Sequence, residues 1–159
     1  MPKLRKRVPS CFLGVDPGQN GGLVAYYNHV LVEASKMPAT ERDIWEWFRL
    51  KNQINAMAVI EKVHSMPKQG VASSFKFGYH YGLLRMALIG NRIPFEEVTP
   101  RAWQKGLDIP PRKSSESPTQ WKNRLKGLAQ QYFPGEKVTL ATADALLIAL
   151  YCERKHGQK

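Results

Sequence analysis

The stretch from residue 12 to residue 18, an apolar run that ends in Asp16 and a Pro-Gly turn, constrains the fold more than any other part of this sequence. We expect residues 10–16 to form a buried strand and residues 22–27 to form the antiparallel strand after the turn. Asp16 ends the first strand, where burial of a carboxylate is costly unless a metal ion or a hydrogen-bond donor pairs with it. Glycines in the turn can adopt positive φ and let an anion approach the backbone. In isolation the pattern is more typical of a hairpin whose Asp caps its own turn, so a site must be argued from the remaining chain.

A second carboxylate occupies the same position on another predicted strand. Residues 56–61 form a short apolar run that ends in Glu61, which is typical of a central parallel strand buried on both faces. In open α/β sheets, ligands bind at the carboxyl edge of the strands. Either acid alone could be structural, but two acids that end neighbouring strands favour a site.

A third carboxylate, Asp144, lies in the first turn of a helix predicted over residues 142–155. This helix is apolar on nearly all sides, so we expect it to be buried against the sheet. An Asp at this position is stabilised by the helix dipole and needs no function. Asp144 is therefore a candidate only together with Asp16 and Glu61.

The remaining pattern predicts a single domain over residues 1–159, with a basic arm at 1–9 and a flexible Pro- and Ser-rich loop at 107–118. Residues 62–70 are expected to form another loop. The other predicted strands are 29–35 and 94–98, and the other predicted helices are 40–50, 72–90, one that begins at 99, and 119–133.

The chain is strongly basic, with a net charge of +11 and a pI near 9.8. Because Lys and Arg neutralise phosphates, nucleic acid is the expected partner. A membrane surface would require a basic amphipathic helix with an exposed apolar face, and the sequence offers no good example. No apolar run has the length of a membrane span or of a signal peptide, so we expect a cytoplasmic protein without a membrane partner. Cys11 and Cys152 lie in apolar surroundings, which predicts buried free thiols, and no Cys/His pattern has zinc spacing.

Several short segments, taken in order, resemble the RNase H-like superfamily and, more narrowly, the RuvC-type Holliday-junction resolvases of phage type. These segments are 14–18, 60–61, 69–71 with 75–78, 98–100 with Trp103, and 143–149. They span most of the chain, and the ordered set is far more specific than any one of them.

The resemblance implies an α/β RNase H-like fold with a mixed five-stranded sheet, an antiparallel three-strand meander plus parallel strands, flanked by helices. It also implies a homodimeric, metal-dependent endonuclease of DNA recombination and repair that resolves four-way junctions by paired symmetric cuts, inside a bacterial or phage-infected cell. Asp16, Glu61 and Asp144 match the family's acidic metal ligands and are the implied catalytic residues. Two Mg²⁺ or Mn²⁺ ions per site would be held by them, with Asp16 as the bridging ligand.

One departure from the family pattern leaves an alternative open. Members often carry a further acid three or four residues before the helix Asp, where this chain has Ala141 and Leu140. A neutral residue could suffice there, or Thr139, Thr142 or Glu136 could act through water. The alternative is a junction-binding protein with a weakened or inactive nuclease site.

A second alternative comes from the Asp-Gly strand-turn opening, which sugar kinases and actin-like ATPases share. Those proteins enclose a nucleotide between two such domains, for which 159 residues are too few.

The resemblance gives residues 66–80 a DNA-facing role, in which Phe75 or Phe77 stacks on an unpaired base. Residues two apart cannot share a helix face, so one of the two aromatic rings is expected to pack in the core. For each cation a solvated surface role is the alternative. The candidate DNA-binding residues are Gln69, Phe75, Lys76, Phe77, Arg101, Lys105, Arg112, Lys113, Lys122 and Arg124. The helix over 72–90 has more large apolar residues than one core-facing stripe requires and is the predicted dimer interface.

Overall fold

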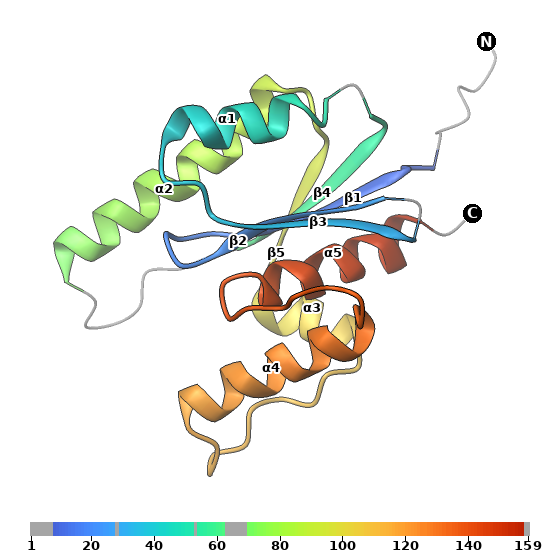
Figure 1. Ribbon diagram of the computed structural model, residues 1–159. Helices are drawn as coiled ribbons and strands as arrows, with labels where there is room; N and C mark the ends of the chain where they lie inside the picture. The colour runs from blue at the N-terminus through green and yellow to red at the C-terminus, as the bar shows by residue number, and fades with distance from the viewer. Residues whose placement is uncertain (1–7, 28, 53, 63–69, 158–159) are drawn as a thin grey trace.

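The computed structural model describes residues 8–27, 29–52, 54–62 and 70–157, in which helices cover both faces of a mixed sheet (Figure 1). The meander consists of β1 (Cys11–Asp16), β2 (Gly22–Tyr27) and β3 (Leu31–Lys36), all antiparallel. Two strands parallel to β1, β4 (Ala56–Glu61) and β5 (Phe95–Val98), complete the order β3-β2-β1-β4-β5. The predicted fold class, an α/β fold with a mixed five-stranded sheet, is confirmed.

The helices form two layers, one on each face of the sheet (Figure 1). One layer holds α1 (Glu41–Arg49) and α2 (Val71–Gly90), and the other holds α3 (Pro100–Gly106), α4 (Pro118–Tyr132) and α5 (Ala143–His156). Alternation along β1 supplies both cores, because Phe12 packs with the α5 layer while Leu13 and Val15 pack with α1 and α2.

Local side-chain chemistry defines the start of three helices. The N-cap hydroxyls of α1, α3 and α4 each accept a backbone N–H from the first turn, and these N-caps are Thr40, Thr99 and Ser117. The third strand begins at Leu31, two residues later than expected, because His29 adopts a φ of 62° and belongs to the turn.

Gly14 determines how closely α5 approaches the sheet. A Cβ on Gly14 would lie 2.0 Å from the carbonyl oxygen of Ala145 and 2.5 Å from the backbone nitrogen of Ala149. The helix therefore lies directly on the middle of β1, and residues 143–150 are all buried. This confirms the predicted burial of the last helix and fixes Asp144 close to the end of β1.

The state of the cysteines agrees with the expectation from the sequence. Cys11 and Cys152 are free and buried. Over the described residues, no helix combines the length and the apolarity that crossing a bilayer requires.

We predict that Gly14→Ala destabilises the protein by about 1–3 kcal/mol or more, because the new methyl group forces α5 away from β1. Gly127→Ala on α4 is the matched control, since a Cβ there meets nothing within 4 Å and Ala is favoured in a helix by about 0.5–1 kcal/mol. Urea unfolding measured on both variants tests the difference. Equal stability of the two variants would show that the α5–β1 contact tolerates a side chain.

Candidate active site

The sheet brings Asp16 and Glu61 to one edge. β1 and β4 are parallel neighbours whose register pairs Val15 with Ile60, so the two acids that follow leave adjacent strands side by side. Both acids end their strands, as the sequence predicted. Asp144 joins them from the first turn of α5, where the close packing on Gly14 holds it.

Electrostatic interactions tie the three carboxylates into one cluster. Burial raises the pKa of Asp16 well above its ordinary value, and the charges of Asp144 and Glu61 raise it further. Burial also raises the pKa of Glu61, to about 7; a hydrogen bond from the indole N–H of Trp103 (2.7 Å to Oε2) opposes this shift, while Asp144 adds to it. Such mutual repulsion is costly without a cation to offset it.

One cation of the protein itself reaches this cluster. The ammonium of Lys122, on α4, pairs with Oδ2 of Asp144. Burial acts to lower the pKa of Lys122, but Asp144, Asp16 and Glu61 together raise it above its ordinary value. The sequence predicts Lys122 as a phosphate contact. Its ammonium lies beside the carboxylates, where a phosphate bound at the cluster could meet it.

The chemistry of the cluster fits a hard divalent cation. Oδ1 of Asp144 is buried and has no hydrogen-bond partner, which is costly for a carboxylate oxygen unless a cation or a donor meets it. Carboxylate oxygens are the ligands that Mg²⁺ prefers. Within the described ranges, however, no three or more His, Cys, Asp or Glu side chains are grouped tightly enough to hold a metal ion.

An ordinary turn occupies the position at which the resemblance expects a further acid. Thr139 and Thr142 bond to each other through their hydroxyls (3.1 Å) and cap each other's backbone N–H groups. A Cβ on Gly22 would lie 2.5 Å from the carbonyl oxygen of Ala141, so this turn packs tightly on β2. Leu140 is exposed, and the cluster contains three carboxylates.

A cleft of about 1010 Å³ opens beside Asp16, between the turn after β1 and the first half of α2. Its lining includes Phe75, Phe77, Lys76 and Lys122. Phe75 is 73% exposed, whereas the half-buried ring of Phe77 lies against Gly18 in the lining of the cleft. Neither ring belongs to the buried core, so the expectation that one of them packs in the core is wrong. Gln69 lies outside the described residues.

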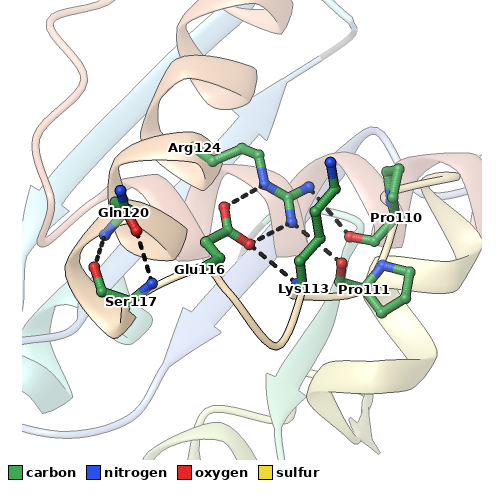
Figure 2. Close-up of polar contacts among 7 residues, drawn as sticks. All are labelled: Pro110, Pro111, Lys113, Glu116, Ser117, Gln120 and Arg124. Atoms are coloured by element: carbon green, nitrogen blue, oxygen red, sulfur yellow. Dashed lines mark hydrogen bonds and ion pairs between the residues drawn. The ribbon is translucent and has the colours of Figure 1, made fainter.

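Arg124 fastens the loop between α3 and α4, as Figure 2 shows. Its guanidinium donates to both carboxylate oxygens of Glu116 (2.9 Å each) and to the carbonyls of Pro110 (3.2 Å) and Pro111 (3.3 Å). It also lies over the Trp121 ring, 4.3 Å from the centroid. These contacts tie the loop expected to be flexible to α4 and use most of the guanidinium's donors inside the chain.

The other predicted DNA contacts lie at the surface. Arg101 and Lys105 are exposed on α3, and Arg112 and Lys113 are exposed on the loop that Arg124 holds. Sequence reasoning did not assign functional roles to Trp103, which orients Glu61, or to His80, which contacts the turn after Asp16. The family resemblance had included Trp103 without giving it a role, and no local sequence signal marks His80.

Solved structures of one protein share this fold. Thermus thermophilus RuvC matches with a TM-score of 0.55 and 15% sequence identity, over 92% of this chain and 96% of that one. T. thermophilus RuvC in complex with Holliday junction substrate matches with a TM-score of 0.59 and 16% identity, over the same shares. No family model matches the sequence, and no curated protein matches it. At this identity the likeness establishes a RuvC-like RNase H fold.

We predict that Glu61→Gln flattens the pH dependence of stability in metal-free buffer. The folded state binds the Glu61 proton more tightly than the unfolded chain does, so stability is lost as the pH rises from about 4.5 through about 7. The loss attributable to Glu61 is at most about 3 kcal/mol. Gln keeps an acceptor for Trp103 and removes the charge.

Urea unfolding between pH 4 and pH 8 in the presence of EDTA measures this effect. Glu46→Gln, which removes a charge from the surface ion pair with Arg49 on α1, is the control and should keep the pH profile of the parent protein. If the stability of Glu61→Gln changed with pH in parallel with that of the parent, the raised pKa of Glu61 would be contradicted.

Proposed function

We propose that this protein is a metal-dependent, structure-selective endonuclease that binds four-way DNA junctions and resolves them by paired symmetric phosphodiester cuts. The observation that carries the proposal is the cluster of Asp16, Glu61 and Asp144 at the carboxyl edge of a RuvC-like sheet. A cleft beside the cluster and a net charge of +11 support a polyanionic substrate. This function belongs in DNA recombination and repair, in the cytoplasm of a bacterial or phage-infected cell.

Asp16, Glu61 and Asp144 would hold two Mg²⁺ or Mn²⁺ ions, with Asp16 as the central residue of the three because it interacts electrostatically with both other acids. Such a pair would lower the pKa of a bound water and stabilise charge on the attacking and leaving oxygens. Trp103 orients Glu61 by donating its indole N–H. Lys122 is placed to pair with a phosphate oxygen that enters beside Asp144.

The remaining basic residues would bind the junction arms. Arg101 and Lys105 on α3 and Arg112 and Lys113 on the following loop are exposed, which suits phosphate contacts. Arg124 supports the loop that carries two of them. Exposed Phe75, at the rim of the cleft beside Lys76, is the better candidate for stacking on an unpaired base.

A homodimer follows from the symmetry of the substrate, since two equivalent cuts call for a two-fold axis. On α2, exposed apolar side chains recur at spacings of seven and three residues, which places them on one face of the helix. The members of this stripe are Tyr79, Met86 and Ile89. Gly78 and Gly82 lie along the same stripe with open space around them, which would let two helices approach closely.

The second candidate function is junction binding with a weakened or inactive nuclease site. The observation that favours it is the exposed, neutral Leu140 and the neighbouring Ala141 where a further acid is often found. DNA binding depends on the basic surface and the cleft. A protein of this second kind would therefore bind the same four-way junction without cleaving it.

We predict that Asp16→Asn reduces cleavage of a synthetic four-way junction by more than about 100-fold, which exceeds the usual cost of losing an outer-shell partner of a metal. Junction affinity in EDTA should be unchanged, because the basic surface is intact. Asp108→Asn is the control, an exposed position with a φ of 57° that Asn tolerates. Measurements in Mg²⁺, Mn²⁺ and EDTA separate the two candidate functions, since a protein that binds tightly and never cuts is the second one.

We predict that preference for a four-way junction over a duplex of equal length persists as salt rises. Non-specific affinity should fall roughly a thousandfold between 50 and 200 mM salt if six or more phosphates are engaged. A junction reader also gains from fitting a branched shape that a duplex reaches only by deformation. A competition titration near physiological salt measures the ratio, and equal binding of both DNAs would favour a general basic nuclease.

We predict that Met86→Glu converts a dimer into a monomer at micromolar concentration, because it places a charge in the middle of the apolar stripe. Leu50→Glu is the control, an equally exposed apolar residue at the end of α1 and away from the stripe. Sedimentation velocity measures both variants. A parent protein that is already monomeric at this concentration would refute the assignment.

A further inference from the structure

The turn that follows Asp16 is held from outside by α2. Gly18 donates its backbone N–H to Nδ1 of His80 at 3.2 Å. Phe77, one helical turn earlier, packs on the same glycine, since a Cβ there would lie 3.3 Å from the edge of its ring. Gly18 has a φ of 110°, which side-chain-bearing residues rarely adopt, so both contacts fall on the turn residue whose conformation depends on glycine.

The turn packs tightly against the backbone of Asp16, so the position of the turn constrains that of Asp16. Gly21 donates its N–H to the carbonyl of Gly18 at 3.0 Å, which closes the turn. A Cβ on Gly21 would lie 2.1 Å from the carbonyl oxygen of Asp16. Any displacement of Gly18 therefore moves the backbone on which the Asp16 carboxylate stands.

The chemistry of His80 suits an acceptor. Nδ1 can accept the Gly18 amide only while the imidazole is neutral, with its proton on Nε2. Burial lowers the pKa of His80, which favours this neutral form. His80 also lines the cleft beside Asp16, so the contact lies at the candidate active site.

We propose that His80 is a positioning residue of this site: by accepting the Gly18 amide it fixes the turn after Asp16 and aims the Asp16 carboxylate at Glu61 and Asp144. The proposal rests on the proposed function and adds to it a residue that acts through the backbone of Gly18. It also gives the first half of α2 a role in the geometry of the carboxylates.

A second link between α2 and the rest of the protein allows this role to be isolated. The guanidinium of Arg85 pairs with the carboxylate of Glu97 on β5 at 2.7 Å. The buried anchors of the helix, Leu84, Ala87 and Leu88, lie in its second half. Arg85→Gln thus removes one contact of the same helix without touching the turn.

The test compares three variants. His80→Leu fills a similar volume without an acceptor, whereas His80→Asn places an oxygen near the position of Nδ1, and Arg85→Gln is the control. Three quantities are measured on each: Mn²⁺ affinity by calorimetry, amide hydrogen exchange at Gly18, and the kcat and junction Kd of cleavage.

For His80→Leu we expect a 10–100-fold loss in Mn²⁺ affinity or in kcat, the usual effect of removing an outer-shell partner. Gly18 exchange should rise on the order of 2–10-fold with the loss of one hydrogen bond. His80→Asn should restore both quantities toward the parent, and Arg85→Gln should leave them unaltered.

The outcomes separate the two proposals. A parent that binds Mn²⁺ but never cuts a junction refutes the nuclease, while a His80→Leu loss of Mn²⁺ affinity still supports the positioning role. A parent that cuts, with His80→Leu equal to it in kcat, Mn²⁺ affinity and Gly18 exchange, overturns the positioning role and leaves the nuclease standing. Equal losses in His80→Leu, His80→Asn and Arg85→Gln also overturn it, since they indicate general loosening of α2.

Discussion

The close contact between α5 and β1 is the interaction on which the rest of the structure depends. It exists because Gly14 has no side chain, which lets the backbone of α5 lie against the strand near Ala145 and Ala149. The same contact completes one hydrophobic core and sets Asp144 beside Asp16. Core packing and the candidate site are thus consequences of a single steric condition in the middle of the sheet.

Clustering three acids at a sheet edge has an electrostatic cost that the chain offsets only in part. Lys122 pairs with one oxygen of Asp144, and Trp103 donates to Glu61. The other Asp144 oxygen is buried without a partner, and the pKa of Asp16 stays well above its ordinary value because of burial and its two acidic neighbours. Binding of a cation, as proposed, would offset this cost and would link stability to metal binding.

The elements on the two sides of the cluster present different surfaces. On the α5 side, Arg124 holds the loop that exposes Arg112 and Lys113. A network of hydrogen bonds thus supports a basic surface. On the other side, α2 turns one face to the sheet and another to solvent. If the exposed stripe forms the dimer, the helix that joins two protomers is also the helix whose His80 and Phe77 contact the turn after Asp16.

The order of the elements and the candidate acids could be predicted from the amino-acid sequence. Period-two and helical patterns and Thr caps located the strands and helices to within about two residues, and acids at strand ends singled out Asp16 and Glu61, because these signals are local. The family resemblance added Asp144 as a candidate. The packed fold was needed to show that Lys122 pairs with Asp144, that Arg124 donates to Glu116 and two carbonyls, and that His80 accepts from Gly18. Those contacts join residues on separate elements, and a side chain's partner there depends on how helices pack across the sheet, which no local pattern encodes.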